Sequence, residues 1–175
     1  MTIEALIAEH KADMADKWAD LIFGTYPVET QKIWKNKKNR FSNPVGAAIR
    51  EATGELIDHL LQWEDADAIC TSLDKMIRIR SVQDFSPSQA LSFLFLFKKL
   101  LRDEYFEKLR KSEELEHLLR FEAKLDNMVL LAIDIYSRSR EQIYRLRVEE
   151  VKRSQHTLLK KARMIVDVTA DKAEE

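Results

Sequence analysis

The stretch "SPSQALSFLFLFKKLL", residues 86–101, decides the fold of this 175-residue chain. Its apolar centre "FLFLF" could form a strand if it stood alone, but a helix-starting signal comes directly before it. Ser86 can cap a helix, Pro87 suits the first helical position, and Gln89 completes a capping box. Apolar residues then continue at helical spacing as far as Tyr105. We therefore expect a helix that is apolar nearly all round at its start, and hence the most buried helix of the protein.

The composition around this helix indicates an all-α protein. Glycine and proline occur only three times each, whereas all-β and α/β folds need turn residues every few positions. Hydrophobic residues make up 45% and charged residues 34% of the chain, a balance typical of a helix-rich globular protein. We expect a single helical-bundle domain of five to seven helices, with a long C-terminal helix.

A second helix start stands at Asn43, a good N-cap, with Pro44 at the first helical position. The spacing of apolar residues predicts further helices over residues 3–23 and from about 65 to 80, and a short helical turn near residues 29–34. Both proline-containing stretches therefore have a structural explanation, because each starts a helix.

The last helix is expected to be the longest, because neither glycine nor proline follows Ser88. Ser112 is expected to cap it, and the helix is expected to continue into the 160s. Residues 1–155 should form the helical domain, and residues 156–175 a C-terminal helix extension or tail. The residues expected to face the core are Leu115, Leu118, Leu119, Leu125, Met128, Val129, Ala132, Ile133 and Tyr136.

A helix of that length exceeds what one small domain can cover, so its distal part needs another surface. Apolar residues continue there without forming a clean heptad, and the flanking Arg, Lys and Glu residues could set a register by pairing. We expect a homodimer that uses this helix; the alternative is a monomer with a disordered tail. The apolar residues concerned are Ile143, Leu146, Val151, Leu158 and Leu159.

Metal, haem and catalytic sites are poorly supported by the sequence. A ferritin-like di-metal centre needs two E-x-x-H motifs, and the chain has one, at Glu114 and His117. Glu55 and His59 are one turn apart, an ordinary surface pair. A haem would need an axial ligand facing an apolar cavity, yet both histidines lie among charged residues. The single Cys70 has no adjacent helper. We expect no cofactor, no metal and no enzymatic activity.

Positive charge is concentrated in the last part of the chain, although the net charge of the whole chain is small. Residues 138–163 hold nine Lys and Arg against three Glu, while the whole chain has a formal charge of −1. A solvated helix face explains this better than a nucleic-acid surface, which remains the alternative. No apolar run approaches the length of a membrane span, and the N-terminus does not resemble a signal peptide. With only one cysteine, a cytoplasmic location is expected.

One segment, "AIDIYSRSREQIYRLRVEEVKR", carries polar residues beside apolar ones. Asp134 interrupts an apolar run, and a mid-helix acid next to buried leucines normally needs a partner. Two interpretations stand side by side: an ion-paired seam between helices, and a polar interface or small-ligand site. The residues of this polar seam are Asp134, Tyr136, Arg140, Tyr144, Arg147 and Glu150.

Four segments taken in order resemble a known family. They are "WADLIFGTYPVETQKIW" (18–34), "RFSNPVGAAI" (40–49), "IRIRSVQDFSPSQALSFLFLFKKLLR" (77–102) and "DIYSRSREQIYRLRVEEVKR" (134–153). Together they resemble the N-terminal domain of RsbT co-antagonist proteins of the RsbRD type. The resemblance implies a globin-like helical fold without haem, which in full-length co-antagonists forms dimeric signal-input modules of the stressosome, attached to a STAS domain.

The 175 residues contain no βαβ pattern that would correspond to a STAS domain. We therefore expect a free-standing sensory or regulatory domain that acts through protein contacts with an unidentified partner. The resemblance supplies no catalytic residue. Two alternatives stay open, a ligand- or haem-binding globin-like sensor and a nucleic-acid-binding protein that uses the basic last helix.

Overall fold

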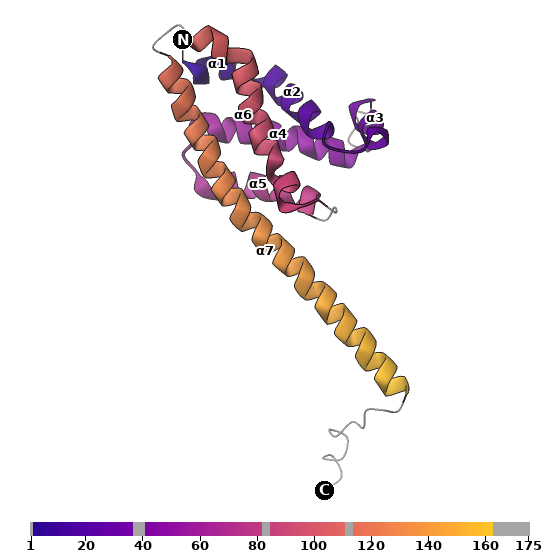
Figure 1. Ribbon diagram of the computed structural model, residues 1–175. Coiled ribbons are helices and arrows are strands. Elements are labelled where there is room, and N and C mark those ends of the chain that lie inside the picture. The colour runs from indigo at the N-terminus through magenta and orange to yellow at the C-terminus, as the bar shows by residue number, and fades with distance from the viewer. Residues whose placement is uncertain (1, 37–40, 82–84, 111–113, 163–175) are drawn as a thin grey trace. The chain divides into compact units, whose positions relative to one another are not determined.

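A computed structural model describes residues 2–36, 41–81, 85–110 and 114–162 of the chain. Within these ranges every regular element is an α-helix, so the expected all-α class and helix number are confirmed (Figure 1). Ser112, the expected cap of the last helix, lies outside the described residues. The helices are α1 (Ile3–Glu9), α2 (Lys11–Phe23), α3 (Val28–Asn36), α4 (Pro44–Gln62), α5 (Ala66–Ser81), α6 (Pro87–Leu109) and α7 (Leu115–Lys161).

The chain divides into two compact units, residues 1–137 and 138–175. The first contains α1 to α6 and the beginning of α7, and the second contains the rest of α7. Among the described helices, none combines the length and the apolar composition that a membrane-spanning segment requires.

Helix α4 begins where the sequence predicts, with Asn43 as its N-cap and Pro44 at its first position. The Asn43 Oδ1 atom accepts a 2.9 Å hydrogen bond from the Gly46 backbone N–H, and its Nδ2 donates 3.1 Å to the Trp34 carbonyl. A Cβ at Gly46 would come within 2.2 Å of that same Nδ2. Glycine is therefore required here, because the cap side chain lies directly against the helix and ties α4 to α3.

Helix α6 likewise begins at Ser86 and Pro87. The Gln89 backbone N–H donates to Ser86 Oγ at 3.3 Å, and the Ser86 N–H donates to Gln89 Oε1 at 2.9 Å. Both halves of the capping box are thus formed, and two N–H groups that the helix cannot satisfy internally are paired.

Replacing Ser86 with alanine is expected to lower the free energy of unfolding by about 1 kcal/mol, because the Gln89 N–H loses its acceptor. Urea unfolding followed by circular dichroism measures the change. Ser154→Ala, at an exposed position near the C-terminal end of α7, is the matched control and should leave stability unchanged or slightly raised, since alanine is the better helix former. Equal stability of the Ser86 variant and the wild type would contradict the cap's contribution.

The prediction of one helix over residues 3–23 was wrong in one respect, because the chain bends at His10 and forms two helices. His10 has φ −111° and ψ 22°, its N–H donates to the Leu6 carbonyl, and its own carbonyl accepts from the Met14 N–H. One residue therefore closes α1 and opens α2. The apolar spacing is the same on both sides of the bend, so periodicity does not reveal it.

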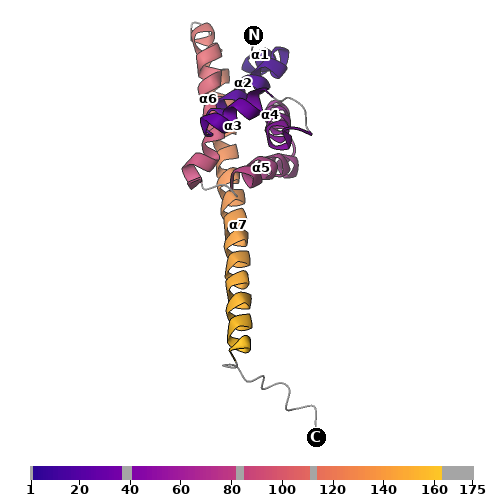
Figure 2. The same ribbon diagram turned by 90° about the vertical axis from the view of Figure 1, so that its right-hand side faces the viewer.

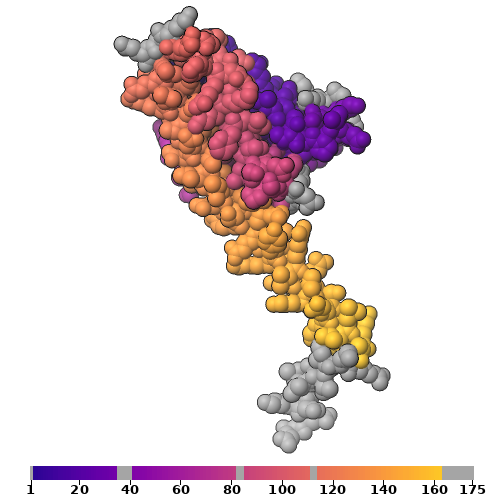
Figure 3. All heavy atoms as spheres, viewed as in Figure 1, coloured from indigo at the N-terminus to yellow at the C-terminus, as the bar shows by residue number. Residues whose placement is uncertain are grey.

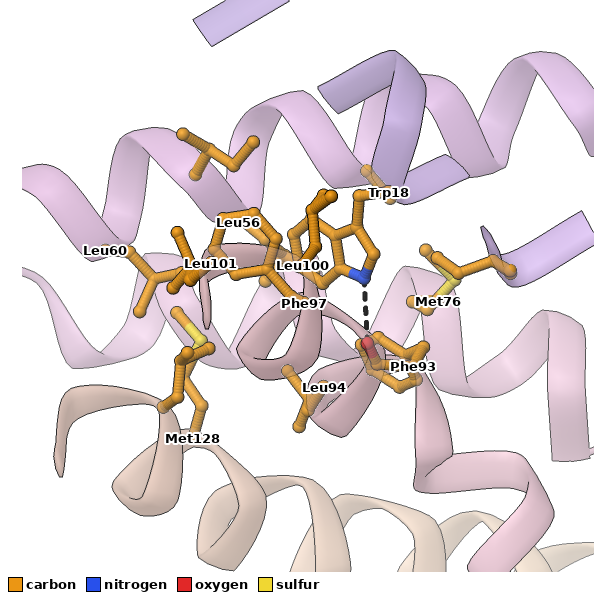
Figure 4. Close-up of a cluster of buried hydrophobic side chains, with 14 of the residues drawn as sticks. Trp18, Leu56, Leu60, Met76, Phe93, Leu94, Phe97, Leu100, Leu101 and Met128 are labelled. Carbon is orange, nitrogen blue, oxygen red and sulfur yellow. Dashed lines mark hydrogen bonds between the residues drawn. The ribbon is translucent and has the colours of Figure 1, made fainter. Parts of the chain in front are cut away.

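The core lies between α2, α4, α5 and α6. Trp18 of α2 is fully buried and its ring stacks on Phe97 of α6 with centroids 4.3 Å apart. Its indole N–H donates a 2.7 Å hydrogen bond to the Phe93 carbonyl, as Figure 4 shows. Helix α6 supplies the largest set of buried residues among α1 to α6, so the sequence identified its central helix correctly: Ala90, Leu91, Phe93, Leu94, Phe97, Leu100, Leu101, Tyr105 and Leu109.

An ion-pair cluster joins α6 to the first part of α7, and the two helices lie side by side in both ribbon views (Figures 1 and 2). Glu122 is only 4% exposed. Its two carboxylate oxygens each accept a 2.6 Å hydrogen bond from Arg102, and Lys98 Nζ lies 3.6 Å away. Lys98 also pairs with Asp126 at 2.8 Å. The buried carboxylate is therefore matched by a bidentate arginine, the geometry that offsets its desolvation best.

Two residues expected to face the core on α7, Leu119 and Ile133, are instead exposed. The inward stripe of the helix runs through Leu118, Phe121, Glu122, Leu125, Met128, Ala132, Ile135 and Tyr136. Glu122 occupies a position in this stripe that leucine would fill in a simple amphipathic helix. The sequence prediction assumed that every leucine or isoleucine near the stripe is buried, which made the buried face too wide.

Candidate functional site

A surface of exposed apolar side chains extends over α6 and the first part of α7, and we call it the α6–α7 face. Figure 3 shows these two helices side by side on one face of the first unit. Phe95 is 53% exposed and Leu130 63% exposed, fractions at which large apolar side chains remain largely in water. The apolar residues of the face are Phe95 and Phe106 on α6, with Leu119, Leu130 and Ile133 on α7.

The ion pairs fix how these residues are arranged. Because Lys98 pairs with Asp126 and Arg102 with Glu122, the helices run antiparallel. This register brings Phe95 level with Leu130 at one end and Phe106 level with Leu119 at the other. The face therefore has two apolar ends separated by a compensated charge cluster.

The second unit, taken by itself, is a helix that continues to Lys161 and has an exposed surface along most of its length. Arg140 donates a 2.8 Å hydrogen bond to the Tyr144 hydroxyl and its guanidinium lies 5.0 Å from the Tyr144 ring centroid. Arg153 pairs with Glu149 one turn earlier. The exposed large apolar residues here are Tyr144, Leu146, Val148, Val151, Leu158 and Leu159.

The residues of the polar seam fall in both units. In the first unit Tyr136 is buried while Asp134 is exposed. In the second unit Arg140 and Tyr144 are brought together, and Arg147 and Glu150 are exposed. The i, i+4 spacing of Arg140 and Tyr144 thus produces a direct contact on one helix face.

Glu55 and His59 of α4 belong to a polar network with α5. Ser72 Oγ donates 2.9 Å to Glu55 Oε2 and lies 3.0 Å from His59 Nε2, while Lys75 Nζ donates to both Glu55 oxygens at 2.8 and 2.9 Å. The hydrogen bond from Lys75 lowers the pKa of Glu55 below its ordinary value of 4.5, and the bond from Ser72 acts in the same direction. Glu55 and His59 therefore serve to link α4 to α5 through Ser72 and Lys75.

The other candidate ligands are dispersed. His117 is exposed on α7, and Cys70 is a half-buried thiol on α5. Among the residues that the structure describes, no group of three or more His, Cys, Asp or Glu side chains could hold a metal ion.

A feature that sequence reasoning missed is Arg80, in the last turn of α5, which is 0% exposed. Its Nε donates 2.8 Å to the Ala90 carbonyl and its Nη2 donates 2.7 Å to the Gln89 carbonyl. Longer bonds of 3.3 Å run from Nη1 and Nη2 to Thr25 Oγ1 and from Nη1 to the Tyr26 hydroxyl. Arg80 thereby joins the end of α5 to the first turn of α6 and to the segment after α2.

Every acceptor that the described residues offer to Arg80 is neutral. Its guanidinium lies over the rings of Tyr26 and Phe85, at 5.3 and 4.8 Å from their centroids, and no carboxylate of the described residues is within ion-pair distance. Burial lowers the pKa of the Arg80 guanidinium, although its interactions with Tyr26 oppose this. In the part of the chain that the structure describes, this desolvated charge is therefore held by hydrogen bonds and aromatic rings.

A sequence signal for Arg80 does exist. The inward stripe of α5 contains Ile69, Leu73, Met76 and Ile77, and Arg80 follows at the spacing of the next turn, whereas Arg78 does not. An arginine in line with such a stripe predicts a buried guanidinium that needs polar partners from neighbouring elements.

One of three comparisons with known proteins found a match. No curated protein and no solved structure matches the chain. Residues 12–151 match the RsbT co-antagonist protein rsbRD N-terminal domain, a range that includes α2 to α6 and most of α7. The match covers well over half of the sequence and includes the α6–α7 face, Arg80 and the polar seam. The chain therefore belongs to the rsbRD N-terminal domain family of RsbT co-antagonist proteins.

Proposed function

We propose that this chain is a non-enzymatic signal-input domain of the stressosome type that acts through protein contacts. The α6–α7 face supports the proposal, because large apolar side chains gathered in water on two adjacent helices of a folded domain are typical of interaction surfaces. Membership of a family of co-antagonist domains supports the regulatory role. The single cysteine is compatible with the reducing cytoplasm in which we place it.

The partner that fits the α6–α7 face is a second copy of the chain. Two-fold dimers bring the same patch together from both subunits, so the patch must be self-complementary. The two apolar ends can pack on their counterparts, while the central cluster of Lys98, Arg102, Glu122 and Asp126 already compensates its own charge. Burying this centre therefore strands no unpaired charge, which is the usual obstacle to covering ionised groups.

We propose that the second unit carries the output. Its helix presents exposed apolar residues between basic and acidic ones, a pattern suited to another helix of a regulatory partner. The polar seam, with Arg140 and Tyr144 in contact, would add orientation to that contact. No contact in the described part of the chain specifically favours haem or nucleic acid, so neither alternative is proposed.

The oligomeric state tests the dimer. We expect light scattering to show a dimer for the full chain, and a monomer for Leu130→Asp, because a carboxylate in an apolar contact is costly to bury. Val28→Asp is the matched control, since Val28 is equally exposed but lies on α3. Val28→Asp should remain a dimer. At protein concentrations low enough for all three proteins to be monomeric, both variants should have the unfolding midpoint of the wild type, which would show that neither substitution disrupts the fold.

A monomeric wild type at tens of micromolar would contradict the dimer, and so would a dimer that survives Leu130→Asp. A truncation after Glu150 separates the two surfaces. If the α6–α7 face suffices, the truncated chain stays dimeric and loses only its contact with the output partner.

A further inference from the structure

The buried charge of Arg80 borders a recess of about 250 Å³ lined by Thr25, Arg80, Phe85, Ser88, Gln89 and Ser92. We propose that this recess binds a small organic carboxylate with an apolar body, whose negative charge is matched to Arg80. The proposal goes beyond the input-domain function, because the α6–α7 face could form a dimer whether or not the recess is occupied.

The chemistry of the lining selects an anion. Among the described residues, Arg80 is the single charged residue of the lining, and every acceptor that they offer its guanidinium is neutral. The recess also lies at the first turn of α6, where the backbone dipoles present positive potential. Hydroxyl groups of Thr25, Ser88 and Ser92 surround it. Thr25 and Ser92 now donate to the Ile22 and Gln89 carbonyls, and Ser88 Oγ lies 3.1 Å from Ser86 Oγ, so each would have to turn from its present partner to donate to a ligand oxygen.

The charge count favours a carboxylate over a phosphate. One guanidinium matches one negative charge, whereas a phosphate dianion would bring a second charge that no lining residue compensates. Arginine's planar fork also fits the two oxygens of a carboxylate. The Phe85 ring supplies an apolar wall. The recess of about 250 Å³ suits an organic acid of about ten non-hydrogen atoms, since each atom takes somewhat less than the roughly 30 Å³ of a water molecule.

The hydrogen bonds of Arg80 show where the ligand oxygens would enter. The bonds to the Gln89 and Ala90 carbonyls are short and hold the guanidinium in place. The two bonds to Thr25 Oγ1 are 3.3 Å long, at the weak end of the range, and Thr25 belongs to the lining. A rotation of Thr25, which would also break its 2.7 Å hydrogen bond to the Ile22 carbonyl, would let a carboxylate replace the two long bonds with shorter, charge-assisted ones.

Occupancy of the recess would act on three helices at once. Arg80 ends α5, Thr25 follows α2, and Gln89 and Ala90 belong to the first turn of α6. A ligand that replaces Thr25 as the acceptor for Arg80 Nη1 and Nη2 therefore changes the contacts that hold the end of α2 to the first turn of α6. Because α6 carries part of the α6–α7 face, the recess is placed to couple a small acid to the proposed contact surface.

The test measures the unfolding temperature of the full chain as benzoate is added at constant ionic strength. We expect the temperature to rise with benzoate concentration and to stay constant with benzamide, which has the same shape without the charge. Arg80→Met should abolish the rise, and the matched control Arg78→Met should keep it, since Arg78 lies exposed on the same helix. Ser92→Leu fills the recess and leaves Arg80 intact, so it should also abolish the rise even if Arg80→Met fails to fold.

Three results would overturn the proposal. The first is no rise with benzoate or with 2-methylpropanoate up to millimolar concentration. The second is an equal rise with benzamide, which would make the recess a purely apolar site. The third is an equal rise with inorganic phosphate, or one that persists in Ser92→Leu, either of which indicates general ion effects. None of these results alters the dimer measured by light scattering.

Discussion

Replacing Trp18 with alanine is expected to lower the free energy of unfolding by about 4 kcal/mol, in the range for removing a buried aromatic ring. Trp18 is fully buried between α2 and α6, and its ring stacks on Phe97. The variant loses this packing, opens a cavity in the centre of the core and removes the hydrogen bond to the Phe93 carbonyl. Urea unfolding at equilibrium, followed by circular dichroism, gives the value.

Trp18→Phe separates the two contributions. Phenylalanine retains most of the ring packing but cannot donate to the Phe93 carbonyl, so the expected loss is about 2 kcal/mol, from one hydrogen bond and a smaller cavity. Equal losses in the alanine and phenylalanine variants would show that the hydrogen bond, and not the ring, stabilises this part of the core.

Replacing Arg80 with alanine is expected to cost about as much as the tryptophan change, about 4 kcal/mol. The change removes the bonds to the Gln89 and Ala90 carbonyls and leaves a cavity between Tyr26 and Phe85. Each hydrogen bond from a charged donor contributes about 1.5 to 3 kcal/mol, and the desolvation of the charge offsets part of that gain. Urea unfolding measures the result.

Arg80→Met tests whether the cost comes from volume or from hydrogen bonding. Methionine fills most of the space that the arginine side chain occupies. The Gln89 and Ala90 carbonyls lose a charged donor, but they belong to α6, where helical N–H groups can still bond to them. We therefore expect the free energy of unfolding to fall by about 2 kcal/mol. Arg78→Ala, at an exposed position two residues earlier, should change stability by less than about 0.5 kcal/mol. A wild-type unfolding midpoint in Arg80→Ala would contradict the structural role assigned to this guanidinium.

Local chemistry made part of the fold predictable. The starts of α4 and α6 each depend on a cap followed directly by a proline, and both starts were identified from the sequence. The bend at His10 was not, because the residues on either side keep one apolar spacing. A backbone change that preserves the hydrophobic pattern is invisible to periodicity, and it depends on packing between distant segments.

In the candidate sites, too, some features could be predicted from local sequence and others depend on the tertiary fold. Leu119 and Ile133 are exposed because α6 and the core cover only a narrow stripe of α7. The width of that stripe is set by the neighbouring helices and cannot be read from the sequence of α7. Arg80 and Glu122 both lie in inward stripes, so their positions were readable from spacing, but their partners were not. Thr25, Gln89 and Ala90 come from other helices or from the loop after α2, and only the tertiary fold brings their oxygen atoms to one guanidinium.

The aromatic rings beside Arg80 give the protein a built-in optical reporter. Tyr26 lies against Trp34 with ring centroids 4.6 Å apart, and against Phe85 at 5.2 Å. Trp34 is half-buried and one ring away from the guanidinium, so its emission wavelength should respond when the surroundings of Arg80 change. Trp18, enclosed in the core, should emit at a constant wavelength under the same conditions. Native fluorescence of the unlabelled chain can therefore report on this corner of the fold in real time, with Trp34→Phe identifying the responding residue.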